Sequence, residues 1–293
     1  EMIVYAPKNL PNNQPLVITL HGFNQSASYQ RDNTQWNNLA DTAKIVVVYP
    51  QYQGGFWDTG GVRGSSNDIQ FIETIIDEMY KRYGINRNRV YVSGFSLGAM
   101  MTYNIMEQLS DKIAACAPVS GVRFDNRAPK VNGRQVPFIH THGTGDDVFK
   151  WGGDPGHMAG GYPAISEYVQ KWATYYKCTD KKFIQPYPAN KSGSKDAMTR
   201  WTQPGSSLEV ALLQLDGVGH WHSDAQGWGG ISTTQEIWRF MKRYTLGPEP
   251  PQVKAVQPEN NSFDLLPDTH RTFTLTLDGE AEAADATAQI TSG

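Results

Sequence analysis

One stretch of the chain constrains its fold more than any other, the run at residues 88–101. Strand-forming residues at 90–92 are followed by Gly-Phe-Ser-Leu-Gly at 94–98 and then by helix-forming residues. A serine flanked in this way by two glycines lies on a sharp strand-to-helix turn, which leaves its hydroxyl exposed at the end of a sheet. We therefore predict that Ser96 is a nucleophile and that the backbone N–H of Leu97 stabilises an oxyanion. The alternative is an ordinary serine in a glycine-rich turn.

A serine nucleophile requires a general base, and the base requires an acid that orients it. On this kind of turn the acid and the base follow the serine in the order Asp or Glu, then His, each after the end of a strand. Asp146 and Asp147 follow the apolar run at 137–141, and His220 follows the apolar run at 208–215. All of these candidates occur in the required order. This agreement argues against the ordinary-turn interpretation.

The other histidines have to be weighed against His220. His222 is the rival base, but His220 directly follows the glycine-containing turn at 217–219, which allows its side chain to swing over the end of the sheet. No histidine spacing matches a metal-binding motif, so we expect no metal and no other cofactor. The remaining histidines discussed here are predicted to be structural: His21, His140 and His142.

A second oxyanion donor is expected after the apolar strand at 16–20. This strand runs directly into His21, Gly22 and Phe23, and a loop in this position can direct one backbone N–H toward the nucleophile. We predict that the donor is the N–H of Phe23. The alternative is a plain glycine-containing loop.

Strand-like and helix-like runs alternate along the first five-sixths of the chain. Apolar runs predict strands at 2–6, 16–20, 45–49, 90–92, 113–119, 137–141 and 208–215. Helical spacing predicts helices at 34–43, 69–83, 99–109, 162–176 and 233–244. The run at 51–66 is rich in glycine and aromatic residues, which suits a loop over a site. This alternation predicts an α/β fold with a mostly parallel sheet and helices on both faces.

The composition changes at the proline-rich residues 247–251. We predict one catalytic domain at 1–246, a linker at 247–251 and a short β-rich segment at 252–293, similar to a fragment of an immunoglobulin-like sandwich. A structural spacer is the expected role of this segment, and sugar binding is the alternative.

Charge and hydropathy exclude several classes of partner. The net charge is −3 and no run of Lys or Arg occurs, which argues against binding to nucleic acid or to an anionic membrane. No apolar stretch approaches the roughly 20 residues of a membrane span. The first residues show no basic and apolar leader, so export cannot be read from them. The two cysteines, Cys116 and Cys178, exclude a disulfide scaffold, but one bridge and buried free thiols both remain open.

The motifs together carry a family resemblance. The chain resembles carbohydrate esterase family 1 of the α/β-hydrolases, which includes feruloyl esterases and acetyl xylan esterases, and more broadly the polyhydroxybutyrate depolymerase-like esterases. The matching segments lie at residues 15–17, 20–22, 25–27, 67–68, 89–92, 94–100, 142–146, 216–217 and 219–220. In the His-Gly-Thr-x-Asp pattern of this family the acid is the fifth residue, which selects Asp146 over Asp147.

The resemblance implies an exported enzyme, secreted or periplasmic, that hydrolyses feruloyl or acetyl esters of plant cell-wall xylan through an acyl-enzyme. Esterified xylan would be its partner, with no cofactor, and the oligomeric state stays open. Tryptophans would line the ester or sugar site, with core packing as the alternative for each: Trp57, Trp151, Trp221 and Trp228. Two departures concern the acyl pocket, namely Trp221-His222 where many relatives have Trp-Pro, and the glycine-rich loop at 149–162.

Two other functions compete with this expectation. One is a hydrolase of another substrate, such as an aliphatic polyester depolymerase, a general esterase or a peptidase. The other is a carbohydrate-binding protein that has a hydrolase fold but no activity. The presence of Ser96, Asp146 and His220 argues against the second, because a binding protein has no need of all three.

Overall fold

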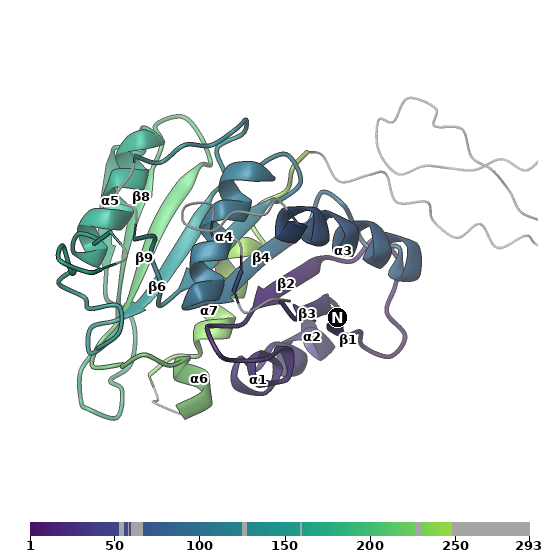
Figure 1. Ribbon diagram of the computed structural model, residues 1–293, viewed down its shortest axis with the longest axis horizontal. Coiled ribbons are helices and arrows are strands. Elements are labelled where there is room, and N and C mark those ends of the chain that lie inside the picture. Colours follow the sequence, from purple (N-terminus) through teal and green to yellow (C-terminus); the bar gives the residue numbers. More distant parts are fainter. Residues whose placement is uncertain are drawn as a thin grey trace, which may run out of the picture. The chain divides into compact units, whose positions relative to one another are not determined.

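The computed structural model describes residues 1–52, 56–57, 59, 67–124, 128–158, 160–226 and 230–247 (Figure 1). These residues belong to one unit, Glu1–Gly247. The predicted β-rich segment at 252–293 lies outside the described residues, and so does most of the predicted linker at 247–251. The proposed division into domain, linker and segment therefore stays a prediction.

A single sheet organises the described residues, with the strand order β1-β3-β2-β4-β5-β6-β9-β8-β7. The six strands from β3 to β9 in this order are parallel, and β1, β8 and β7 are antiparallel to their neighbours. The strands are β1 (Met2–Tyr5), β2 (Leu16–Leu20), β3 (Val46–Pro50), β4 (Val90–Phe95), β5 (Ala115–Val119), β6 (Phe138–Gly143), β7 (Asp180–Ile184), β8 (Ala197–Thr202) and β9 (Glu209–Leu215). The predicted mostly parallel sheet is confirmed.

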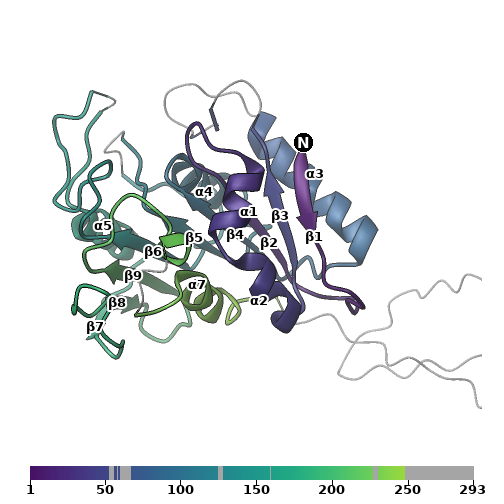
Figure 2. The same cartoon turned by 90° about the horizontal axis from the view of Figure 1, so that it is seen from below.

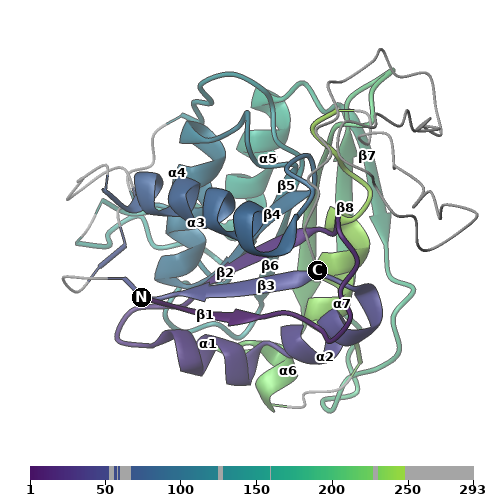
Figure 3. The same ribbon diagram turned by 90° about the vertical axis from the view of Figure 1, so that its right-hand side faces the viewer.

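Helices cover both faces of this sheet (Figure 3). They are α1 (Ala27–Asn33), α2 (Trp36–Ala43), α3 (Asn67–Tyr83), α4 (Leu97–Gln108), α5 (Ile165–Tyr175), α6 (Ser223–Gln226) and α7 (Thr233–Met241). One core lies between the sheet and α3, α4 and α5, and the other lies between the sheet and α1, α2 and α7. Seen from below, α1, α2 and α7 lie in front of the sheet (Figure 2).

The central strands are buried along their whole length. Every residue of β2, β3, β4, β5 and β6 is buried. Alternate residues enter opposite cores, so that Ile18 packs in the core of α3 to α5 while its neighbour Val17 packs in the core of α1, α2 and α7. Burial on both faces explains why these strands appear in the sequence as continuous apolar runs.

Two strands, β7 and β8, and two helices, α1 and α6, were not predicted from the sequence. Strand β7 has the sequence Asp-Lys-Lys-Phe-Ile and is almost wholly exposed at the edge of the sheet, so it lacks an apolar pattern. It pairs with β8, which in turn extends β9. Helix α1 was also not predicted, although Ser26 caps it by accepting a hydrogen bond from the Tyr29 N–H.

Cys116 lies on β5, and both cysteines are buried free thiols in the structure. Burial raises the pKa of both thiols, that of Cys178 to about 11. Neither thiol is therefore suited to act as a nucleophile at neutral pH. Among the described residues, no helix combines the length and apolar character that a membrane span would need.

Candidate active site

Ser96 occupies the turn between β4 and α4. Its backbone has φ of 56° and ψ of −116°, a combination that is costly for a residue with a side chain. The Ser96 N–H donates to the carbonyl of Val119, while its own carbonyl accepts from the N–H groups of Ala99 and Met100. The neighbouring strand and the first turn of the helix therefore hold the serine in its strained conformation.

The glycines on both sides of Ser96 make this turn possible. A Cβ atom on Gly94 would lie 2.2 Å from the carbonyl oxygen of Gly98, and a Cβ on Gly98 would lie 2.4 Å from that of Leu20. Both distances are shorter than any real contact between such atoms. The Gly-x-Ser-x-Gly pattern thus has a direct steric reason here.

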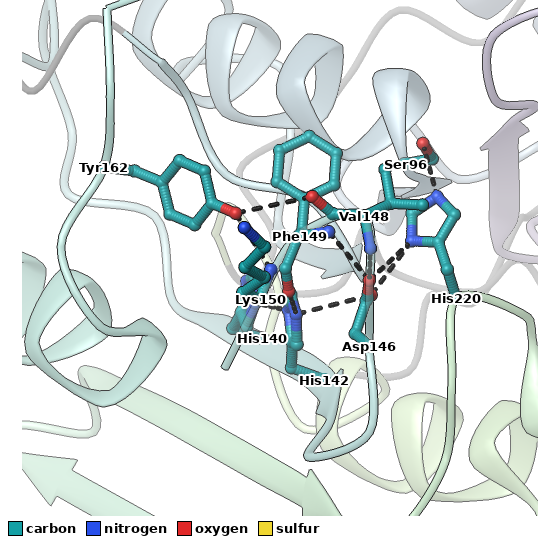
Figure 4. A network of polar contacts seen from close by, with 9 residues as sticks. All are labelled: Ser96, His140, His142, Asp146, Val148, Phe149, Lys150, Tyr162 and His220. Atoms are coloured by element: carbon teal, nitrogen blue, oxygen red, sulfur yellow. Dashed lines mark hydrogen bonds and ion pairs between the residues drawn. The ribbon is translucent and has the colours of Figure 1, made fainter. Parts of the chain in front are cut away.

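The three residues predicted to act together lie in one hydrogen-bonded row (Figure 4). His220 Nε2 lies 3.0 Å from Ser96 Oγ. On the other side of the ring, His220 Nδ1 lies 2.9 Å from Asp146 Oδ2 and 3.1 Å from Oδ1. A carboxylate only accepts, so Nδ1 carries the proton and Nε2 is left to accept the serine proton.

Asp146 is held from several directions. Its Oδ1 accepts hydrogen bonds from the N–H groups of Val148 at 2.9 Å and Phe149 at 2.7 Å. Asp146 is buried, whereas Asp147 is exposed to solvent. Of the two candidate acids, only Asp146 therefore contacts His220.

The His220 ring is confined by two phenylalanines. Its centroid lies 5.0 Å from that of Phe95 and 5.8 Å from that of Phe149. Phe95 precedes the nucleophile and Phe149 follows the acid by three residues. Neither ring was predicted to belong to the site, because nothing in the local sequence pattern shows which side chain faces the histidine.

The rival base is placed elsewhere. His222 is buried, with Nδ1 3.5 Å from Asp224 Oδ2, and burial lowers its pKa. Asp224 in turn accepts hydrogen bonds from the N–H groups of Thr233 and Thr234 at the start of α7. His222 therefore contacts the α6–α7 region and is not in the row that contains Ser96.

The loop after β2 lies against the nucleophile. A Cβ atom on Gly22 would be 3.1 Å from Ser96 Cβ, and the Gly22 N–H donates to Gln25 Oε1. In the described part of the chain, no hydrogen bond uses the N–H of Phe23 or that of Leu97. Both groups stay available for an oxyanion, and their role remains a prediction.

Trp57 packs against this loop through His21. The Trp57 indole N–H donates to the His21 carbonyl at 2.9 Å, and the rings of His21 and Trp57 lie 5.2 Å apart. Burial lowers the pKa of His21. Trp57 is only 2% exposed, so it is a packing residue under the loop and not an open substrate contact. This corrects the expectation that Trp57 lines the ester or sugar site.

The other aromatic candidates differ in their positions. Trp151 is half-buried and its ring lies 6.2 Å from that of His142. Trp221 is also half-buried, and its ring covers Gly219, where a Cβ would be 2.0 Å away. Trp228 lies outside the described residues. The exposed rings of Phe23 and Phe56, which were not among the predicted substrate-binding aromatics, stack at 5.2 Å.

Among the residues that the structure describes, no three His, Cys, Asp or Glu side chains are grouped to hold a metal ion. The row itself offers a hydroxyl, an imidazole and a carboxylate, with backbone donors beside them. Such a set can transfer an acyl group by nucleophilic attack, with one proton moved by the imidazole.

Comparisons with known proteins show that the chain is similar to several esterases. A family model described as phospholipase/carboxylesterase matches residues 60–153. The bifunctional acetylxylan esterase/xylanase of Neocallimastix patriciarum is 36% identical over 245 residues, which cover 83% of this chain and 33% of that protein. Feruloyl esterase B of Piromyces equi is 28% identical and is matched over 84% of this chain and 45% of its own length.

A shorter match concerns a different substrate. Poly(3-hydroxyalkanoate) depolymerase C of Paucimonas lemoignei is 33% identical over 129 residues, which cover 41% of this chain and 31% of that protein. The chain thus spans less than half the length of each of these three relatives. Among solved structures, an acetyl xylan esterase from Aspergillus awamori has the same fold, with a TM-score of 0.58, 18% identity and coverage of 82% of this chain and 93% of the other.

Proposed function

We propose that this chain is a serine esterase of the α/β-hydrolase superfamily that removes acyl groups from xylan. The support is its similarity to acetylxylan and feruloyl esterases, which are the enzymes of carbohydrate esterase family 1 that its motifs resemble. The single observation that carries this proposal is the row from Ser96 Oγ through His220 to Asp146, at 3.0 Å and 2.9 Å. The strained turn presents the serine at the start of this row.

The first half of the proposed reaction acylates the enzyme. Ser96 Oγ attacks the ester carbonyl while His220 Nε2 takes its proton, and Asp146 stabilises the imidazolium that forms. The carbonyl oxygen becomes an oxyanion that accepts hydrogen bonds from the N–H groups of Leu97 and Phe23. The bond between the acyl carbon and the sugar oxygen then breaks, His220 gives its proton to that oxygen, and the sugar leaves as an alcohol while the acyl group remains on Ser96.

The second half repeats the same steps with water. His220 takes a proton from a water molecule, the hydroxide attacks the acyl-serine carbonyl, and the serine oxygen leaves with the proton. The products are the free acid and the regenerated enzyme. This cycle requires no cofactor, because every proton moves through His220.

The substrate class rests on the named relatives. The acetylxylan esterase/xylanase is the more similar of the two xylan-acting relatives, at 36% against 28% identity over a similar share of this chain. We therefore expect acetate to be released faster than ferulate. Polymeric xylan is met outside the cell, so the proposal includes a secreted or periplasmic location.

A second candidate substrate has an observation in its favour. The match to a poly(3-hydroxyalkanoate) depolymerase supports the hydrolysis of an aliphatic polyester by the same serine chemistry. That match covers 41% of this chain, about half the share that the xylan-acting relatives cover. We therefore rank it second.

One experiment separates these substrates. Initial rates would be measured on acetylated xylan, methyl ferulate and poly(3-hydroxybutyrate), with the Ser96→Ala variant as the control for each. The proposal expects acetate release to be the fastest and all activity to require Ser96. If hydroxybutyrate were released faster than acetate, the proposed substrate would be an aliphatic polyester and not xylan. If Ser96→Ala had the same rates as the wild-type chain, Ser96 would not be the nucleophile.

A further inference from the structure

A second row of buried polar groups runs from Tyr103 through His140 and His142 to Phe149. Figure 4 shows the last three of these residues beside Asp146. The Tyr103 hydroxyl lies 2.9 Å from His140 Nδ1, and His140 Nε2 lies 3.0 Å from His142 Nδ1. His142 Nε2 lies 2.7 Å from the carbonyl oxygen of Phe149. This row therefore connects helix α4, strand β6 and the loop that contains Asp146.

The direction of every hydrogen bond in this row follows from the neutrality of its two imidazoles. Burial lowers the pKa of His142 to about 4, and burial together with His142 lowers that of His140 well below its usual value. Each neutral ring has one N–H and one acceptor nitrogen. Because the Phe149 carbonyl only accepts, His142 donates to it from Nε2. It follows that His140 donates to His142, and Tyr103 donates to His140.

The contact between His142 and Asp146 is consistent with this assignment. His142 Nε2 lies 3.5 Å from Asp146 Oδ2, which is longer than its 2.7 Å bond to the Phe149 carbonyl. A neutral ring at this distance does not form an ion pair with the carboxylate. The influence of His142 on Asp146 therefore passes through Phe149.

Phe149 joins the two rows. Its N–H donates to Asp146 Oδ1, its carbonyl accepts from His142, and its ring packs against His220. A displacement of this one residue would move a donor of the acid and a wall of the base together. Whatever fixes the Phe149 carbonyl therefore also fixes the geometry of the acid and the base.

The far end of the second row returns to the nucleophile. Tyr103 lies on α4, the helix that begins directly after Ser96. The contacts thus form a closed circuit from Ser96 through His220, Asp146, Phe149, His142, His140 and Tyr103 back along α4 to Ser96. Burying so many polar groups is costly unless every one is paired, and each ring nitrogen in this row has a partner.

We propose that Tyr103, His140 and His142 are positioning residues. They hold the loop that contains Asp146, here called the acid loop, in place relative to helix α4. They touch no reacting atom and act through Phe149 and Asp146. This proposal rests on the proposed serine chemistry of Ser96, His220 and Asp146. It adds that these core residues, which lie on the side of Asp146 away from His220, fix the geometry of the acid and the base.

The test compares four variants on 4-nitrophenyl acetate, a small ester that does not depend on the natural acyl group. His142→Leu removes the donor to Phe149, and His142→Gln keeps an N–H within reach of the same carbonyl. Tyr103→Phe removes only the hydroxyl at the far end of the row. Tyr176→Phe is the matched control, because its buried hydroxyl accepts from the Val136 N–H in the same core but lies outside the circuit.

We expect kcat to fall about 10- to 100-fold in His142→Leu with little change in KM, since small misplacements of catalytic groups cost up to about 10²-fold. His142→Gln should recover most of this loss. Tyr103→Phe should lower kcat several-fold, whereas Tyr176→Phe should lower only the melting temperature. The far-downfield proton signal of an imidazole N–H bonded to a carboxylate should weaken in His142→Leu and persist in Tyr176→Phe.

Either of two results would overturn the proposal. These are an unchanged kcat in folded His142→Leu and Tyr103→Phe, or equal kcat losses in Tyr103→Phe and Tyr176→Phe. If His142→Leu does not fold, the comparison of Tyr103→Phe with Tyr176→Phe decides alone. The proposed function fails separately, if the wild-type chain hydrolyses no ester or if Ser96→Ala keeps the wild-type rate.

Discussion

At the scale of single residues, the site depends on groups that their neighbours hold in place. Ser96 is fixed by its strained backbone and by the hydrogen bond to Val119. His220 is held between Phe95 and Phe149. Such preorganisation removes the cost of arranging the groups at the moment of reaction.

Gly98 gives a direct test of the turn. In Gly98→Ala the added methyl group would lie 2.4 Å from the Leu20 carbonyl oxygen, so α4 or β2 would have to shift. We expect a loss of about 1 to 3 kcal/mol in the free energy of unfolding and a large fall in kcat, because Ser96 would move with the helix. Urea denaturation and ester hydrolysis would measure these effects. Gly247→Ala, where the added methyl group would have no neighbour closer than 3.8 Å, should leave kcat unchanged, and a fully active Gly98→Ala would contradict the steric argument.

The buried histidines make a prediction about pH. Burial lowers the pKa of His142 to about 4, although Asp146 and the Phe149 carbonyl act in the opposite direction. In the unfolded chain a histidine titrates near about 6.5, so the unfolded state binds more protons between these two values. The free energy of unfolding should therefore fall as the pH falls from about 6.5 to about 4. The buried His142 imidazole should account for roughly 3 kcal/mol of this loss at a pH of about 4.

The measurement is the free energy of unfolding as a function of pH for the wild-type chain and for His142→Gln. The variant has no imidazole to protonate at this position, so its stability should decline less steeply over the same range. Parallel curves for the two proteins would show that His142 is not a buried neutral group.

At the scale of elements, the parts that could be predicted from the sequence are those with a local signal. The buried strands and the turn at Ser96 have such signals, because burial on both faces requires apolar runs and the turn requires two glycines. Strand β7 has none, since an edge strand can be polar and depends on pairing with β8. The row from Tyr103 to Phe149 could not be predicted either, because its members meet only when α4, β6 and the acid loop pack together.

Trp57 tests how the loop after β2 is supported. Trp57→Phe keeps the packing but removes the indole N–H that donates to the His21 carbonyl. A lost hydrogen bond of this kind costs about 1 kcal/mol, and we expect kcat to fall several-fold because the N–H of Phe23 would be less well placed. Steady-state kinetics on 4-nitrophenyl acetate would show this, with Trp238→Phe on the opposite face as the control. An unchanged kcat in Trp57→Phe would argue against Phe23 as an oxyanion donor.

At the scale of the whole molecule, the sheet brings together groups that are far apart in the chain. Ser96 follows β4, Asp146 follows β6 and His220 follows β9, so all three lie beyond the same ends of parallel strands. The sequence predicted that each of these three residues follows the end of a strand, and in which order they occur along the chain. The substrate could not be predicted, because the shape of an acyl pocket depends on loops such as 149–162 and on side chains that no pattern places.

The most direct test of the central claim is to trap the acyl-enzyme. The chain would be mixed rapidly with excess 4-nitrophenyl acetate, quenched in acid and digested, and the peptides would be analysed by mass spectrometry. Our account predicts a stoichiometric burst of nitrophenol and an acetyl group on the peptide that contains Ser96, with neither signal in Ser96→Ala. Acetyl transfer to another residue, or undiminished turnover by Ser96→Ala, would contradict it.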